Sequence, residues 1–300
     1  MEYVLRKQQG MNEIGQIEYN PYLMKNMSES VERLSRAINN REKIVIYGYY
    51  DVDGITAVSL LLLLLKYLNA DVEYFIPENI MDERELSYEV VKNHIKFLGA
   101  NLIITVGCGI NSYSAIEHCK ELGIDVIVTD HRICEGVIPD TYVLNPKQGS
   151  CGYPFKELSG AGIAYKLAMA ISMEYKAKCA FKYLDLCMLG TISSDTPIIN
   201  ENKTIVERGI QHLCNTKNYG IKALIKENNV YDINEAAAYK LAFTVIPRIN
   251  AIGRMDDARI AVELFTTEDQ DRASQIAKYL IKEVRINKNY CKWGEESIWI

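Results

Sequence analysis

The chain has 300 residues, of which 48% are hydrophobic and 24% are charged, and its formal net charge at pH 7 is −5. The composition is ordinary for a globular protein, and the length allows one large α/β domain or two smaller ones. The negative charge excludes a basic field over the whole surface, so any binding of nucleic acid has to come from a local groove.

The cysteines and the apolar segments indicate the cellular compartment of the protein. Its eight cysteines form no CxxC pair and no Cys/His spacing suited to zinc, which favours reduced thiols in a cytoplasmic protein. Polar residues follow Arg6 and Lys7, so the N-terminus does not read as a signal peptide. The leucine run 60–65 is too short to span a membrane, because a span takes about 20 apolar residues. We therefore expect a cytoplasmic protein without membrane contact.

In the first half of the chain, apolar runs typical of buried strands alternate with segments of helical period. A first helix is expected at 28–39, with Ser28 as its N-cap. The other helices predicted in this half cover 55–68, 88–98 and 112–122, and the predicted strands cover 44–47, 70–77, 101–106 and 125–129. This alternation with short loops predicts a parallel, doubly wound sheet with right-handed crossovers.

The second half of the chain is mainly helical. After a loop rich in turn-forming residues at 145–162, helices are expected at 163–175 and 182–192. From residue 202 the pattern stays helical, with an interruption at 245–254 and one long helix at 272–296. The predicted fold class is therefore α/β, with a doubly wound, mostly parallel sheet followed by a mainly helical lobe.

Two carboxylates follow the first predicted strand, at the edge of the sheet where open α/β proteins place their ligands. Asp51 and Asp53 are two residues apart, and in extended backbone such residues point to the same side. Their oxygens could then converge on a hard cation such as Mn²⁺ or Mg²⁺. An Asp-rich turn, with Gly54 providing the backbone conformation, explains the same residues equally well.

Six short segments carry a resemblance to a known family. In chain order they read YGYYDVDGIT, LIITVGCGI, VIVTDHR, LNPKQ…CGYPFKELSGAGIAYKL, LGTISSDTP and PRINAIGR, and they span roughly residues 20 to 283. In this order and spacing the chain resembles the DHH phosphoesterase superfamily, and within it the RecJ-type single-strand exonucleases. The resemblance implies a 5′-to-3′ exonuclease for single-stranded DNA, with two Mn²⁺ or Mg²⁺ ions that activate a water for attack on the phosphodiester.

The resemblance assigns catalytic and metal-binding positions, and several of them depart from the family pattern. The catalytic residues implied are Asp51, Asp53, Asp130 and His131, and the implied metal ligands are Asp51, Asp53 and His131. Where the family has Asp, Asp, His and Asp, this chain has Tyr49, Gly107, Arg132 and Ser194. Asp195 stands one residue beyond the last of these positions and could serve as a ligand if the loop shifts its register.

The replacements remove three carboxylates and one imidazole and add a guanidinium. Because divalent ions need nearby negative charge, we expect metal binding to be weakened by several powers of ten, with one ion or none retained. Two hypotheses follow. The chain is either a RecJ-like exonuclease with weak or lost activity, or a non-catalytic pseudo-enzyme that binds single-stranded nucleic acid or a replication or repair protein.

Two further features have alternative readings. Arg248 and Arg254 resemble residues that border the nucleic-acid groove in RecJ-type enzymes and could bind phosphates, but either could equally pair with a core carboxylate. The turn at 159–162 could present backbone N–H groups to a phosphate, although a tight turn that allows close packing is favoured.

The resemblance also predicts the domain organisation. We expect an N-terminal arm and helix at 1–40 and a catalytic-core domain at 41–282, whose sheet part extends to about residue 200 and whose helical part follows. Residues 283–300 are expected to begin an interdomain helix, with the second domain absent.

Overall fold

The computed structural model describes residues 17–77, 85–134, 136–177, 179–245 and 257–291; within these ranges, the side chains of 245, 257 and 284–291 are left out of the description. Residues 1–16 of the predicted N-terminal arm lie outside the described residues, as do the two arginines of the PRINAIGR segment, Arg248 and Arg254.

The centre of the fold is a five-stranded sheet in the order β2-β1-β3-β4-β5, with every neighbouring pair parallel. The strands are β1 (Ile44–Gly48), β2 (Val72–Phe75), β3 (Leu102–Val106), β4 (Asp125–Thr129) and β5 (Tyr142–Leu144). The register pairs Gly48 with Val106 and Val106 with Thr129. The loops after β1, β3 and β4 therefore begin side by side at the carboxyl edge of the sheet.

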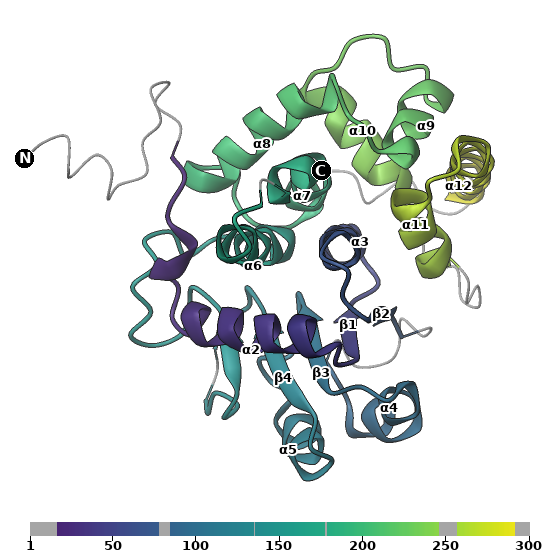
Figure 1. The fold of residues 1–300 in the computed structure, drawn as a ribbon. Coiled ribbons are helices and arrows are strands. Elements are labelled where there is room, and N and C mark those ends of the chain that lie inside the picture. The colour runs from purple at the N-terminus through teal and green to yellow at the C-terminus, as the bar shows by residue number, and fades with distance from the viewer. Residues whose placement is uncertain (1–16, 78–84, 135, 178, 246–256, 292–300) are drawn as a thin grey trace, which may run out of the picture.

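Helices cover both faces of the sheet, as Figure 1 shows. On one face lie α2 (Met27–Asn40), α3 (Val52–Tyr67) and α6 (Gly160–Glu174), and on the other lie α4 (Tyr88–Asn93) and α5 (Tyr113–Glu121). Beyond α3 and α6 come α7 (Leu184–Ser193), α8 (Asn200–Leu213), α9 (Tyr219–Glu227), α10 (Glu235–Val245), α11 (Asp257–Thr266) and α12 (Gln270–Cys291). The 3-10 helices are η1 (Pro21–Leu23), η2 (Ile95–Leu98) and η3 (Ala180–Tyr183).

The alternation of side chains along the strands separates two apolar cores. In β1, Ile44 and Ile46 belong to the larger core, shared with α2, α3 and α6. Val45 and Tyr47 belong to the smaller core, shared with α4 and α5. Successive side chains of a strand point to opposite faces, so a strand buried on both faces has to be apolar throughout. All five residues of β1 are buried.

The predicted fold class is confirmed, and the four predicted strands are present. The short strand β5 was not predicted, because its three residues are too few for a pattern. Two helices start earlier than predicted, because their capping residues lie in what reads as a loop: Asp51 caps α3 and Ser159 caps α6. The prediction of Ser28 as the cap of the first helix is wrong, since the N-cap of α2 is Asn26.

A buried ion pair holds the beginning of the described chain to the helices. Lys166 of α6 pairs with Glu201 of α8, and both side chains are only 1% exposed. Glu201 also accepts hydrogen bonds from the Tyr153 hydroxyl (2.6 Å) and the Tyr19 amide (3.0 Å), while the Lys166 ammonium donates to the Tyr19 carbonyl (2.9 Å). Residues 17–19, which belong to the predicted N-terminal arm, are therefore held in place, and the Ile17 amide donates a hydrogen bond to the Thr204 hydroxyl.

In the part of the chain that the structure describes, none of the helices combines the length and the apolar character needed to cross a membrane.

Candidate functional site

The site lies where the sheet changes winding direction. The chain leaves β1 through α3 on one face to reach β2, and it reaches β3 and β4 through α4 and α5 on the other face (Figure 1). Between β1 and β3 the two connections diverge at the carboxyl edge, which opens a crevice of the kind where α/β proteins bind ligands.

A cavity of about 380 Å³ occupies this crevice. It brings together four residues predicted as metal ligands, which are Asp51, Asp53, His131 and Asp195. The four positions at which the family's ligands are replaced line the same cavity, and they are Tyr49, Gly107, Arg132 and Ser194. Asp130, also predicted to be catalytic, is fully buried beside it. The sequence positions thus meet in space, although their side chains are engaged differently from the prediction.

The two aspartates after β1 do not share an extended loop, so the geometric premise of the sequence prediction is wrong. Asp51 is extended and its carboxylate caps α3 by accepting the Gly54 amide at 2.6 Å. Asp53 already lies in the first turn of α3, and its two oxygens accept the amides of Gly160 (2.8 Å) and Ala161 (2.7 Å). Each carboxylate therefore has a structural role at a helix N-terminus.

These contacts also decide the reading of the turn at 159–162. The amides of Gly160 and Ala161 bind the Asp53 carboxylate, and the amide of Gly162 binds the Ser159 hydroxyl at 2.9 Å. The hypothesis that this turn binds a phosphate is therefore wrong for these three amides, because each already donates a hydrogen bond within the protein. A Cβ on Gly160 would lie 2.8 Å from the Asp53 carboxylate, so glycine is required for this close approach.

The buried carboxyl group of Asp53 has an unusual proton affinity. Burial, and then the negative charge of Asp51, raise the pKa of Asp53 to about 7, and the two amide hydrogen bonds only partly oppose this rise. A carboxyl group with a raised pKa keeps its proton in the folded state over a pH range in which the unfolded chain has released it. Folding is therefore favoured less as the pH increases through that range.

We expect the substitution Asp53→Asn to reveal this titration. From about pH 4, where an unfolded aspartate ionises, up to about pH 7, wild-type stability should fall relative to the variant, because asparagine does not titrate. Urea unfolding at several pH values in a chelating buffer measures the difference, and the other ionisable groups are common to both proteins. If the difference in the free energy of unfolding between the two proteins does not change with pH, the pKa of Asp53 is not raised.

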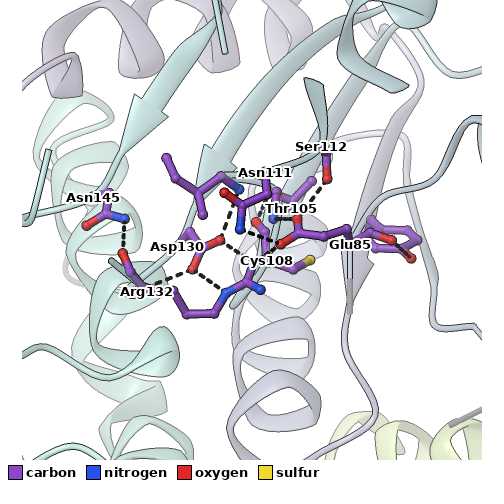
Figure 2. A network of polar contacts seen from close by, with 11 residues as sticks. Glu85, Thr105, Cys108, Asn111, Ser112, Asp130, Arg132 and Asn145 are labelled. Carbon is purple, nitrogen blue, oxygen red and sulfur yellow. Dashed lines mark hydrogen bonds and ion pairs between the residues drawn. The ribbon is translucent and has the colours of Figure 1, made fainter. Parts of the chain in front are cut away.

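Buried Asp130 and half-buried Arg132, from the loop after β4, form a network of charged groups with half-buried Glu85, drawn in Figure 2. The Arg132 guanidinium donates to both oxygens of Asp130, through Nε at 3.1 Å and Nη2 at 2.7 Å, and it also pairs with Glu85 at 2.5 Å. Asp130 further accepts the amides of Ile110 and Arg132, both at 3.0 Å. Both oxygens of this predicted catalytic carboxylate are thus used within the protein.

Arg132 determines the ionisation state of Asp130. Burial alone would raise the pKa of Asp130, but the hydrogen bonds and charge of Arg132 outweigh it, so the pKa of Asp130 is lowered. Burial alone would lower the pKa of Arg132, but the two carboxylates outweigh it and raise this pKa above its usual value. Asp130 is therefore ionised and bound to a permanent cation, which is a stable arrangement without any metal.

Glu85 is a site residue that sequence reasoning missed. Besides Arg132, its carboxylate accepts the Gly109 amide and the Ser112 hydroxyl, each at 2.8 Å (Figure 2). It therefore joins the loop after β3 to the loop after β4. The stretch 82–87 begins with four charged residues and has no helical or strand period, so its sequence does not single out Glu85.

His131 and Gly107 lie next to Asp53. The imidazole Nδ1 atom is buried and has no hydrogen-bond partner among the described residues. Burial lowers the pKa of His131, so the ring is neutral at pH 7. Gly107 has a left-handed φ of +69°, and nothing lies within 4 Å of where its Cβ would be. The position that carries a carboxylate in the family is therefore open space here.

These residues do not fit a pair of divalent ions. Oxygens of Asp51, Asp53 and Asp130 accept hydrogen bonds from the protein itself, and Gly107 offers no ligand. Across the described ranges, no three His, Cys, Asp or Glu residues are grouped so that they could hold a metal ion. Asp195 is exposed at the cavity and comes after the C-cap of α7, Ser194. Among the described lining residues, the unpartnered Nδ1 atom of His131 is the atom best placed to bind a metal.

Comparison with known proteins adds an independent line of evidence. The model of the DHH family, N-terminal domain, matches residues 43–191. The single-stranded-DNA-specific exonuclease RecJ of Bacillus subtilis (strain 168) is 40% identical over 260 residues, which cover 86% of this chain and 32% of that protein. The RecJ of Salmonella typhimurium is 34% identical over 268 residues, or 85% of this chain and 46% of its own. The chain thus spans about a third to a half of the length of these relatives.

Solved structures show the same relationship. A crystal structure of exonuclease RecJ bound to manganese superposes with a TM-score of 0.78 at 29% identity, covering 90% of this chain and 67% of that chain. The RecJ of Thermus thermophilus in complex with Mn²⁺ superposes with a TM-score of 0.75 at 29% identity, over 90% of this chain and 38% of that one.

Proposed function

The chain belongs to the DHH family and is of the RecJ type, and on this premise we propose that it binds single-stranded DNA at the cavity at the carboxyl edge of the sheet, with hydrolysis weakened or lost. The proposal for the ligand rests on relatives described as single-stranded-DNA-specific exonucleases. The cavity, which lies at the winding reversal of the sheet, is the place where such a ligand would be recognised.

One observation carries the proposal of weakened hydrolysis: the Arg132 guanidinium holds both oxygens of Asp130. A divalent ion at Asp130 would have to displace this cation, or else lie beside it and be repelled. Unit charges about 4 Å apart interact by about 4 kcal/mol at an effective dielectric constant near 20, so either event would weaken metal binding greatly. Because these residues do not fit two ions, they do not support hydrolysis by a two-ion mechanism.

The enzymatic alternative has one observation in its favour. The buried Nδ1 of His131 has no partner among the described residues, and Asp51, Asp53 and Asp195 border the same cavity. These four residues would hold one ion at most, Mn²⁺ or Mg²⁺, and would support slow cleavage at best. A replication or repair protein that binds through the same cavity is the other partner that the sequence suggests.

The proposal is tested by calorimetric titration with Mn²⁺ beside an assay on 5′-labelled single strands. We expect single-stranded DNA to bind in the presence of a chelator, with weak metal binding and little or no release of mononucleotides. Two tightly bound ions together with processive release of mononucleotides would overturn the reduced-activity proposal. Failure of the protein to bind single strands at all would overturn the proposed ligand.

A further inference from the structure

We propose that the cavity at the carboxyl edge receives a nucleobase of a single strand, and that its carboxylates favour bases that carry an exocyclic amino group. This inference rests on the proposed function and names what the site would recognise. Tyr49 has the central role, since it stands where the family has a metal-binding carboxylate.

The walls of the cavity are aromatic on two sides. Tyr49 and Tyr50 come directly after β1, and Phe243 comes from α10, so the rings approach from the sheet and from the helical lobe. All three residues are half-buried and line the cavity. Nucleobases stack on such rings whatever their sequence, because every base has a π-face. The cavity volume of about 380 Å³ lies at the lower end of the range of about 300–1,000 Å³ that is usual for small-molecule sites.

The charges in the cavity select against a phosphate. Asp51 and Asp195 are exposed there, while Arg132, which carries the permanent positive charge among the described lining residues, is bound to Asp130 and Glu85. Among the described lining residues, a phosphate group would therefore meet more negative than positive charge at close range, which is unfavourable. A nucleobase is uncharged, so the carboxylates do not repel it in this way.

The same carboxylates give the cavity a chemical preference. The exocyclic amino group of cytosine donates hydrogen bonds that an Asp or Glu oxygen accepts, and thymine has a carbonyl oxygen at the equivalent position. A thymine oxygen would face a carboxylate oxygen without a proton between them. Cytosine should thus bind more tightly than thymine, and the two are matched as pyrimidines of similar size and stacking surface.

The experiment measures binding of fluorescent single strands by anisotropy, in a chelating buffer, with oligo-dC, oligo-dT and an abasic strand of equal length. Wild-type protein is expected to bind oligo-dC about fivefold or more tightly than oligo-dT, and the abasic strand most weakly. Tyr49→Ala should weaken oligo-dC binding by about tenfold or more, and Tyr49→Phe should bind as the wild type does.

Two further variants complete the test. Asp195→Ala should reduce the preference for oligo-dC, and Asp195 is chosen because Asp51 also caps α3. Tyr67→Ala is the matched control, because Tyr67 is 55% exposed at the other end of α3 and should not change binding.

The outcomes separate the inference from the function on which it rests. If wild-type protein binds oligo-dC, oligo-dT and the abasic strand equally, base recognition is wrong while single-strand binding stands. This comparison needs no variant, so it holds even if Tyr49→Ala fails to fold. Equal affinities of Tyr49→Ala and wild type for oligo-dC would also refute the role of Tyr49. If the wild-type protein binds no single strand, the proposed function itself fails.

Discussion

Combining Gly107→Asp, Arg132→His and Ser194→Asp is expected to raise the affinity for Mn²⁺ by about a hundredfold or more. The three changes add two carboxylates and an imidazole, and they remove the guanidinium that holds Asp130. The backbone at Gly107 is left-handed, a conformation that aspartate adopts more readily than most residues, and a Cβ there meets nothing within 4 Å. The variant should also release mononucleotides from 5′-labelled single strands.

The variant with all three substitutions, called the acidic variant, needs a control whose side chains have the same size but no added carboxylate. Gly107→Asn, Arg132→His and Ser194→Asn make the same replacements in size but add no carboxylate, so this control should gain only the effect of removing the Arg132 guanidinium and should bind Mn²⁺ less tightly than the acidic variant. Calorimetric titration gives the affinities, and circular dichroism shows whether both variants fold. If the folded acidic variant bound Mn²⁺ no more tightly than the neutral control, the missing carboxylates at positions 107 and 194 would not be what prevents metal binding.

Lys166→Met is expected to lower the free energy of unfolding by about 3–5 kcal/mol, the cost of leaving a buried charge without its partner. Glu201 is 1% exposed, and after the substitution it would keep only the hydrogen bonds from Tyr153 and the Tyr19 amide. Adding Glu201→Gln should recover part of the loss, because the unpaired charge is then gone. Urea unfolding measures all three proteins.

The control for this prediction lies on α8, the helix that carries Glu201. Lys203 pairs with Glu207 at 3.8 Å, and the two side chains are 64% and 45% exposed. Lys203→Met should change the stability by less than about 1 kcal/mol, as is usual for surface ion pairs. Equal effects of Lys166→Met and Lys203→Met would show that the buried pair contributes no more than an exposed one.

The sheet could be predicted from the sequence because its strands are buried on both faces. A run such as Ile44–Tyr47 has no polar position, so the pattern admits few other readings. Helix starts were harder to predict, since Asp51 and Ser159 are typical both of turns and of N-caps. The strand β5 is too short to produce a period.

For the site, sequence order predicted which residues meet but not what they contact. Asp53 is bound by the amides of Gly160 and Ala161, more than a hundred positions away, and no local pattern indicates such a contact. Arg132 was expected to oppose metal binding through its charge, whereas its pairing with Glu85 depends on how two loops fold beside each other. Long-range backbone contacts of this kind follow from the tertiary structure alone.

The ion pair between Arg132 and Asp130 has a consequence for how the chain folds. The stability that a dissociable ion gives a protein depends on the concentration of that ion, whereas a guanidinium is covalently attached and here lies two residues away from its partner. The positive charge that the Asp130 carboxylate needs is therefore present in the chain itself, whatever the concentration of metal ions. Starving a cell of manganese should leave the amount of folded protein unchanged.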